Sequence, residues 1–173
     1  MRYLLQSLAI ILFLLITNAT CQSKDIVFPH DWRKPLDKET HQEWRIRDIN
    51  KYLIIKVDFN GDGVVDQANL LINNNNNEIG FFAFVSQKDG TFKTFFLDKK
   101  GDINYIKVLG ITVVHPGRYK TACGKGFIDC PEGESEEIFL LHDAINYFKE
   151  GSAQMYFYWD NSTQSFKSVG IDD

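Results

Sequence analysis

The chain has 173 residues, which is the size of one ordinary domain, and no linker-like stretch separates two candidate cores. Its formal net charge is −4, and no basic stripe interleaved with aromatic residues suggests a nucleic-acid partner. Phenylalanine occurs 14 times, which favours sheet over helix because aromatic side chains fit a pleated, half-buried surface. We therefore expect a mainly β (β-rich α+β) single domain of short antiparallel strands and hairpins, with at most one or two short helices.

The N-terminus has the pattern of a secretory signal. Arg2 precedes a mostly apolar run over residues 4–16, and small or polar residues follow as far as Ala19. The run is too short for a comfortable membrane span. We expect residues 1–19 to be a signal peptide that is cleaved after Ala19, and the mature protein to be periplasmic.

Cys21 offers a second interpretation, in which the chain is a membrane-anchored lipoprotein acylated at this residue. The residues before it, Asn18-Ala19-Thr20, match such a processing site poorly. A secreted form and an uncleaved anchor helix are further alternatives. Contact with a membrane is expected only if Cys21 is lipidated.

Residues 20–47 are polar and contain two prolines and two tryptophans. They predict an extended N-terminal arm, with a short helix over residues 38–47 and with Trp32 and Trp44 packing against the domain. The β-rich domain is expected to cover residues 48–173.

Alternating apolar residues and turn signals divide the domain into short elements. The hairpin turn at residues 87–90 contains Asp89-Gly90, a pair that suits a tight turn, and residues 73–77 form an all-asparagine turn. A short helix is expected over residues 143–149. The expected strands are residues 52–59, 64–72, 80–86, 91–97, 103–114, 136–142, 155–159 and 165–171.

Residues 58–66 carry the clearest chemical signal. Side-chain oxygens recur at Asp58, Asn60, Asp62 and Asp66, and two glycines allow a tight bend. Calcium takes six to eight oxygen ligands, so these four side chains, the carbonyl of Val64 and water would nearly complete a shell. We expect a structural Ca²⁺ site, although Asp, Asn and Gly also build polar turns that hold no metal.

This loop is not an EF-hand, because Asn69 occupies the position of the bidentate glutamate and the flanking segments are predicted strands. The pattern Asp-x-Asn-x-Asp-Gly-x-x-Asp resembles the strand-loop-strand calcium hairpin of FG-GAP repeats and integrin-type propellers. The resemblance covers this hairpin alone, and no second copy occurs. A propeller is therefore not implied.

Cys123 and Cys130 enclose a short loop. In an exported protein this spacing predicts a disulfide. A zinc site is a weak alternative, because His115 is the only histidine nearby in the sequence.

Residues 118–130 place positive charge on an acidic chain beside aromatic residues. A rigid loop of this composition is typical of a binding surface, and the plain alternative is a stapled loop with no partner. The candidate surface residues are Arg118, Tyr119, Lys120, Lys125 and Phe127.

A wider resemblance rests on three motifs: the loop beginning at Asp58, the run from Pro116 to Gly126, and the Tyr-Phe-Tyr-Trp-Asp segment that ends at Asp160. Together they are similar to a group of small exported bacterial proteins of unassigned function. This resemblance implies a family and no activity.

No nucleophile motif or complete phosphate-binding loop is present. The acidic run at Glu132, Glu134, Glu136 and Glu137 could supply paired carboxylates for hydrolysis, but a solvated loop is the simpler interpretation.

Three functional hypotheses remain. The first is a non-enzymatic, calcium-stabilised binding domain whose partner is an unknown protein or envelope component. The second is an immunity-type protein that inhibits a toxin delivered to the periplasm. The third is an envelope hydrolase that uses carboxylates without a familiar motif.

Overall fold

The computed structural model describes residues 25–45 and 51–172. The predicted signal peptide, Cys21 and the end of the helix expected over residues 38–47 lie outside these residues. The described chain is mainly β, with antiparallel strands and one four-residue α-helix, α2 (Asp37–Thr40). The predicted fold class is therefore confirmed.

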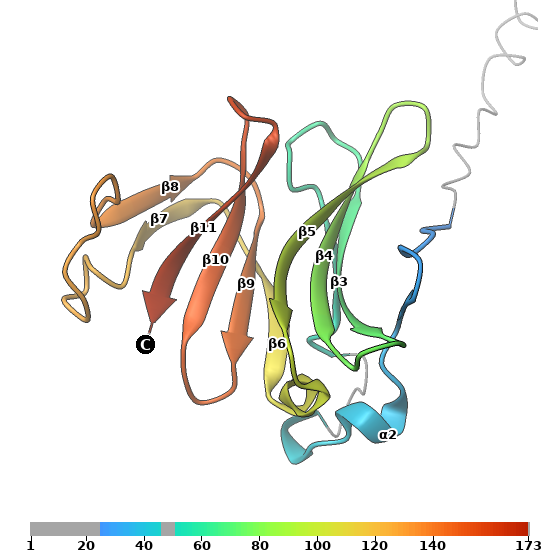
Figure 1. Cartoon of the computed structure of the whole chain (residues 1–173). Helices are drawn as coiled ribbons and strands as arrows, with labels where there is room; N and C mark the ends of the chain where they lie inside the picture. Colours follow the sequence, from blue (N-terminus) through green and yellow to red (C-terminus); the bar gives the residue numbers. More distant parts are fainter. Residues whose placement is uncertain (1–24, 46–50, 173) are drawn as a thin grey trace, which may run out of the picture.

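Two sheets pack face to face (Figure 1). The first sheet has the order β1-β3-β4-β5, with β2 also paired to β3, and the second has the order β11-β10-β9-β6. The first sheet consists of β1 (Trp32–Arg33), β2 (Ile54–Val57), β3 (Asp66–Asn73), β4 (Ile79–Ser86) and β5 (Phe92–Lys100). The second consists of β6 (Leu109–Val114), β9 (Ala144–Lys149), β10 (Gln154–Asp160) and β11 (Ser165–Asp172).

Aromatic rings join the inner faces of the two sheets. Phe81 of β4 stacks on Tyr147 of β9, with ring centroids 4.9 Å apart, and meets Phe157 of β10 edge to face at 5.2 Å. All three side chains belong to the main core and are almost fully buried. Burial of side chains this large supplies much of the driving force for stacking the sheets.

The N-terminal arm, residues 25–45, covers the outer face of the first sheet. Trp32 packs edge to face on Phe82, with centroids 4.9 Å apart, and Phe28 lies 5.8 Å from Phe84. Because the arm covers this face, every residue of β4 is buried. The strand therefore reads as a continuous apolar run rather than an alternating one.

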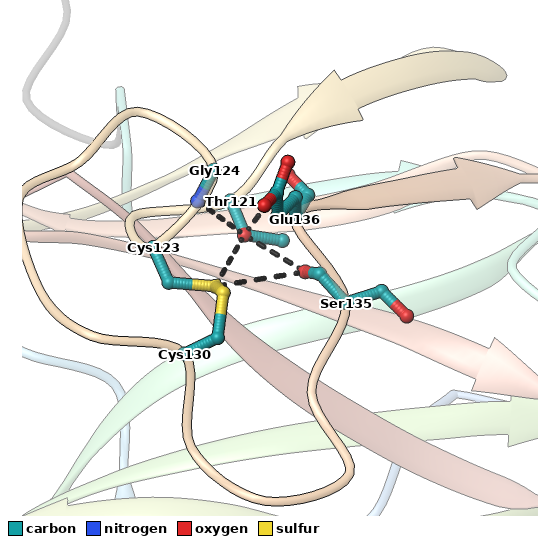
Figure 2. Close-up of a disulfide and its surroundings, with 6 residues drawn as sticks. All are labelled: Thr121, Cys123, Gly124, Cys130, Ser135 and Glu136. Carbon is teal, nitrogen blue, oxygen red and sulfur yellow. Dashed lines mark hydrogen bonds between the residues drawn. A yellow bond between two sulfur atoms is a disulfide. The ribbon is translucent and has the colours of Figure 1, made fainter.

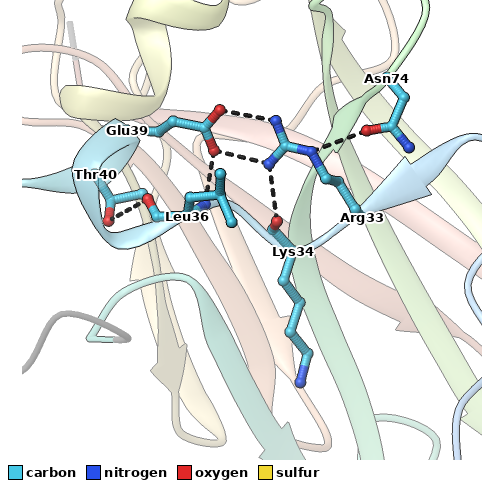
Figure 3. A network of polar contacts seen from close by, with 6 residues as sticks. All are labelled: Arg33, Lys34, Leu36, Glu39, Thr40 and Asn74. Atoms are coloured by element: carbon cyan, nitrogen blue, oxygen red, sulfur yellow. Dashed lines mark hydrogen bonds and ion pairs between the residues drawn. The ribbon is translucent and has the colours of Figure 1, made fainter.

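An ion pair anchors the arm beside Trp32 (Figure 3). The guanidinium of Arg33 donates to both carboxylate oxygens of Glu39, at 2.8 and 2.7 Å, and its Nε donates to Asn74 at 2.9 Å. The same carboxylate accepts the Leu36 N–H at 2.6 Å. The hydrogen bond from Arg33 lowers the pKa of Glu39, against the opposing effect of burial.

A second anchor lies in the short 3₁₀ helix η1 (Glu43–Arg45). The Trp44 indole donates to the carbonyl of Lys107 at 3.1 Å and packs on Tyr52. Arg45 is buried and donates to the carbonyls of Ile106 and Leu109. Burial lowers the pKa of Arg45 to about 10, and the charge of Glu150 opposes that shift.

A third, two-stranded sheet covers the outer face of the second sheet. It consists of β7 (Gly117–Lys120) and β8 (Glu137–Leu140). Tyr119 meets Tyr156 of β10 edge to face at 5.4 Å, and Leu140 is buried with Val114 and Ala144. The two covers shield part of each outer face of the central sandwich, although Phe96 on β5 and Lys167 on β11 remain exposed.

Three sequence predictions about local structure are wrong. The helix expected over residues 38–47 is not continuous in its described part, because α2 ends at Thr40 and the 3₁₀ helix η1 begins only at Glu43. Residues 103–114 do not form one strand, because the 3₁₀ helix η2 (Ile103–Lys107) precedes β6 and is capped by the Asp102 side chain. Residues 143–149 do not form a helix, because β9 occupies this segment. Pairing with both β6 and β10 outweighs the local helix signal.

The hairpin of β4 and β5 and the closing hairpin of β10 and β11 form where the sequence predicts them. In the part of the chain that the structure describes, no helix is long and apolar enough to cross a membrane.

Candidate functional site

The loop of residues 58–66 connects β2 to β3, and internal hydrogen bonds order it. One carboxylate oxygen of Asp58 accepts the Gly61 N–H at 2.7 Å, and the other accepts the Gly63 N–H at 2.8 Å. The Asn60 side chain accepts the Asp62 N–H at 3.0 Å. These bonds satisfy backbone donors in a turn that has no sheet partner.

Asp62 completes the network at the exposed tip of the loop. Its carboxylate accepts the Val64 N–H at 2.8 Å and the Asn60 amide at 3.0 Å. Each carboxylate oxygen has more than one lone pair, so an oxygen that accepts one N–H can still contact a cation.

Asp66 is the buried member of the group and is fully inaccessible to solvent. Its two oxygens accept the Phe59 N–H at 2.9 Å and the Ser86 N–H at 2.8 Å. Burial raises the pKa of Asp66 to about 6, and the charges of Asp62 and Asp58 push in the same direction, although the two N–H donors oppose the shift. Repulsion among the three carboxylates is therefore built into the loop.

Gly61 is required both for its conformation and for its lack of a side chain. Its φ of +76° lies in the left-handed region, and a Cβ atom there would overlap the ring of His142. The loop thus rests against the segment between β8 and β9. Sequence spacing gave no sign of this contact, because 81 residues separate the two positions.

The donor chemistry of the loop fits calcium, because every candidate side-chain ligand offers oxygen. The arrangement is not a complete metal centre, however. Among the described residues, no three His, Cys, Asp or Glu side chains converge into a group that could hold a metal ion. The oxygens of Asp58, Asn60, Asp62 and Asp66 instead point at N–H groups.

The second candidate site is the loop between Cys123 and Cys130, which lie at disulfide distance with Cα atoms 4.8 Å apart. The hydroxyl of Thr121 lies beside this disulfide (Figure 2). It donates to the Ser135 carbonyl at 2.9 Å and accepts the Gly124 N–H at 3.2 Å. Thr121 is 1% exposed, so its hydroxyl ties the two ends of the loop together inside the protein.

The same loop approaches neighbouring backbone closely. A Cβ atom at Gly124 would overlap the main-chain carbonyl of Glu136, and the Ala122 N–H donates to the Gly170 carbonyl of β11 at 2.8 Å. The hydrogen bond to Gly170 therefore holds the loop against the domain, while the disulfide and the contact at Gly124 close the loop itself.

The five residues predicted to form a binding surface do not all face solvent together. Arg118 and Lys120 alternate with Tyr119 along β7, so the two cations are exposed while Tyr119 turns inward and donates to the His115 carbonyl at 2.8 Å. Lys125 lies 5.8 Å from the centre of the Phe127 ring. Phe127 is 51% exposed.

Three further exposed apolar residues belong to this region, and the sequence patterns did not identify them. They are Ile128, Phe139 and Leu141, which are 48%, 63% and 63% exposed. We call residues 115–143, which contain β7, β8 and the disulfide loop, the β7–β8 module. The alternation of β8 could have revealed Phe139, because it faces away from buried Leu140.

The remaining polar candidates form no deep site. His115 and Asp143 pair at 2.9 Å on the surface of the module, a contact that sequence spacing did not suggest. The four glutamates of the acidic run are all exposed, and Glu137 lies 4.0 Å from Arg118. They line a solvated loop rather than a cleft.

Comparison of the chain with protein-family models, curated proteins and solved structures finds no match.

Proposed function

We propose that this protein is an exported, calcium-stabilised binding domain without enzymatic activity, and that its β7–β8 module contacts an unknown protein or envelope partner. The observation that carries the proposal is the group of large apolar side chains that the module exposes: Phe127, Ile128, Phe139 and Leu141. Phe127 and Ile128 border one hollow of the module, and Phe139 and Leu141 border another. Exposed apolar side chains of this size are typical of interaction sites.

The construction of the module supports this role. The disulfide, the Thr121 hydroxyl and the backbone contact at Gly124 order the loop before any partner arrives. A surface that is already ordered loses less conformational entropy on binding, so more of the contact energy appears as affinity. Aromatic and arginine residues are also the usual energetic centres of interfaces.

The charges of the module suggest the kind of partner. Arg118 and Lys120 are exposed on β7, whereas the whole chain has a net charge of −4. Because the module also carries the exposed Glu132, Glu134, Glu136 and Glu137, a complementary partner would present an apolar patch bordered by charges of both signs.

Site-specific photo-crosslinking in the source cells tests the binding surface. A photoreactive amino acid at Phe127 should yield one discrete crosslinked product, and the Ile128→Ser/Phe139→Ser double variant should lose it. The matched control places the same amino acid at Gln87, an exposed turn residue outside the module. Equal crosslinking from both positions, or none from Phe127, would contradict the proposed surface.

Calcium enters the proposal through the carboxylates of Asp58, Asp62 and Asp66. Burial raises the pKa of Asp66, with a smaller contribution from the charges of Asp62 and Asp58, and a bound cation would replace that repulsion with attraction. The resemblance of the loop to calcium hairpins and its oxygen donors both support the assignment. The role is structural, because the loop would order the edge of the first sheet.

Thermal unfolding with calcium and with chelator tests this assignment. Calcium at about 100 times its dissociation constant should add about 2.7 kcal/mol to the free energy of unfolding. This corresponds to a rise of several degrees in Tm. Asp62→Ala should abolish the shift, whereas Asp129→Ala, which removes an exposed carboxylate outside the loop, should retain it. A calcium response that survives Asp62→Ala would place the ion elsewhere.

Export is tested by the intact mass of the protein purified from its source. Cleavage after Ala19 predicts a chain that begins at Thr20. A mass that corresponds to a chain beginning at an acylated Cys21 would instead establish the lipoprotein form. The Cys21→Ser variant should then lack that species.

A further inference from the structure

A cleft of about 550 Å³ opens between the edges of the two sheets, at the opposite end of the sandwich from residues 58–66. The loop end lies near Ser86 and Asn161, whereas the cleft lies where β5 ends and β10 begins. Its lining is mainly apolar and includes Asp98, Tyr147, Met155, Phe157, Ser168 and Gly170.

The side chains of β11 explain why the space is open. Phe166 fills the gap between the sheets beside Phe95 and Trp159, with centroid distances of 5.5 and 5.4 Å. The next two residues on the same face of the strand are Ser168 and Gly170, because side chains alternate along a strand. Two small residues follow a large one, so the sheets remain packed at one end and separated at the other.

Both walls of the cleft contain a β-bulge. Pairing between β4 and β5 slips at Phe81/Phe82, which leaves Leu97 as the extra residue, and pairing between β10 and β11 slips at Gln154/Met155, which leaves Ile171. Bulges bend an edge strand and redirect its side chains, and they are common beside functional sites. Two independent bulges on opposite walls of one cleft indicate that its shape is specified.

The charges at the rim are balanced. The lining includes two aspartates and two lysines. Asp98 pairs with Lys100 at 2.9 Å, and Asp172 lies 3.9 Å from Lys125. Because aspartates and lysines are equal in number in the lining, the cleft presents no net charge to attract a charged ligand, which favours a neutral molecule.

A polar group in the mainly apolar lining would fix the orientation of a bound ligand. Burial raises the pKa of the Tyr147 hydroxyl at the floor of the cleft, and the nearby Asp98 carboxylate acts in the same direction. The Asp98 side chain is still 31% exposed, and a carboxylate can accept about four hydrogen bonds. Asp98 can therefore accept a further hydrogen bond from a ligand that lies over the aromatic floor.

We infer that this cleft binds a neutral, ring-containing small molecule, with its apolar face against Tyr147, Phe157 and Met155 and a hydroxyl or N–H group donating to Asp98. Size and lining agree with the usual character of small-molecule sites, which are mostly apolar with a few placed polar groups. The inference does not depend on the calcium loop or on the β7–β8 module.

Fluorescence titration with N-phenyl-1-naphthylamine tests the cleft, because this probe is neutral, has three aromatic rings and carries one N–H group. The wild-type protein should bind it saturably at one site per chain. Ser168→Leu fills the cleft and should weaken binding at least tenfold. Ser135→Leu makes the same change on an exposed loop outside the cleft and should leave binding unchanged.

Competition tests the polar end of the site independently of the Ser168 variant. 2-Naphthol should displace the probe about tenfold better than naphthalene, because its hydroxyl donates to a charged acceptor. Asp98→Ala should reduce this preference to about twofold or less, with circular dichroism showing that the variant is folded. Absence of saturable binding, or equal binding by Ser168→Leu and Ser135→Leu, would overturn the proposal that the cleft binds a small molecule. Equal affinities for 2-naphthol and naphthalene in the wild type would overturn the role of Asp98 as a hydrogen-bond acceptor.

Discussion

The two sheets of this protein carry covers of different construction on their outer faces. The N-terminal arm lies on the first sheet through side chains, with Trp32 on Phe82 and the ion pair between Arg33 and Glu39. The β7–β8 module lies on the second sheet through Tyr119 on Tyr156 and a backbone hydrogen bond to Gly170. Unlike the arm, it is also closed internally by a disulfide and by the close backbone approach of Gly124 to Glu136.

This difference predicts how each cover responds to change. Side-chain contacts can relax when a neighbour shifts, and they weaken in proportion to the area that is lost. Backbone contacts and covalent bonds cannot shift in this way, so a small change has a local and sharp effect. Substitutions in the arm should therefore lower stability in proportion to the packing that is lost. In the module, a single added Cβ atom or the loss of the disulfide should have a large local effect.

Trp32→Ala should have the largest effect on the arm. It removes the indole that covers Phe82 and leaves the outer face of the first sheet exposed to water. We expect a loss of about 3 kcal/mol in the free energy of unfolding, at the lower end for large aromatic truncations because Trp32 is only partly buried. Urea denaturation measures this change. The control is Phe139→Ala, at an exposed aromatic residue of the module. Like most surface substitutions, it should lower the free energy of unfolding by less than about 0.5 kcal/mol.

Removal of the disulfide should affect the module and spare the sandwich. The Cys123→Ala/Cys130→Ala double variant should lose about 2.5 kcal/mol, because the unfolded chain regains the entropy of a short loop. Hydrogen exchange should show faster exchange at Gly126 and Phe127, whose N–H groups bond within the loop, and unchanged protection in β4. Loss of protection in β4 at the same denaturant concentration would show that the module and sandwich unfold together.

A matched pair of glycines compares the two covers directly. A Cβ atom at Gly124 would overlap a backbone carbonyl, whereas one at Gly80 would meet the rings of Trp32 and Phe82, which are side chains. Gly124→Ala should cost about 2 kcal/mol, and Gly80→Ala should cost less, because rings can move and a constrained carbonyl cannot. Differential scanning calorimetry of both variants measures these losses of stability. A larger loss for Gly80→Ala than for Gly124→Ala would reverse the comparison.

The smallest expected effect concerns the ion pair of the arm. Glu39→Gln should cost about 1 kcal/mol near neutral pH, because a charge-assisted bidentate pair becomes neutral. The folded-state pKa of Glu39 is lowered, first by the hydrogen bond from Arg33. The contribution of the pair is therefore present above the pKa of an unfolded glutamate, about 4.5, and is lost as the pH falls through the lower folded value.

Thermal unfolding of the wild type and of Glu39→Gln between pH 7 and pH 3 measures this dependence. The difference in Tm should shrink toward zero at the acidic end. A difference that stays constant with pH would mean that the carboxylate charge does not anchor the arm.

The predictions for the fold depended on whether local pattern and tertiary pairing agreed. Turn residues and strand-like apolar runs predicted the hairpins correctly, because a hairpin turn and its two strands are adjacent in the sequence. The segment after Asp143 was mistaken for a helix, since a capping residue was given more weight than the alternation of Ile145 and Tyr147. That alternation reports which face of the strand is buried, whereas pairing of its two edges with β6 and β10 depends on distant segments.

The sites divide in the same way. Spacing was sufficient to bring Cys123 and Cys130 together and to identify the residues of the loop from Asp58 to Asp66. It did not reveal that Ser86 donates to Asp66 or that His142 lies against Gly61. It also did not predict the cleft, whose opposite walls come from β5 and β11.

The sequence by itself determined the β-rich class, the hairpins and the cysteine spacing, because these depend on residues that are close along the chain. Only the tertiary structure decided that two covers shield parts of the sandwich, that Arg118 faces outward while Tyr119 faces inward, and that Ser168 leaves a cleft above Tyr147 and Phe157. Such features depend on which strands become neighbours. That choice is made by the collective burial of aromatic side chains from distant segments, and no local pattern encodes it.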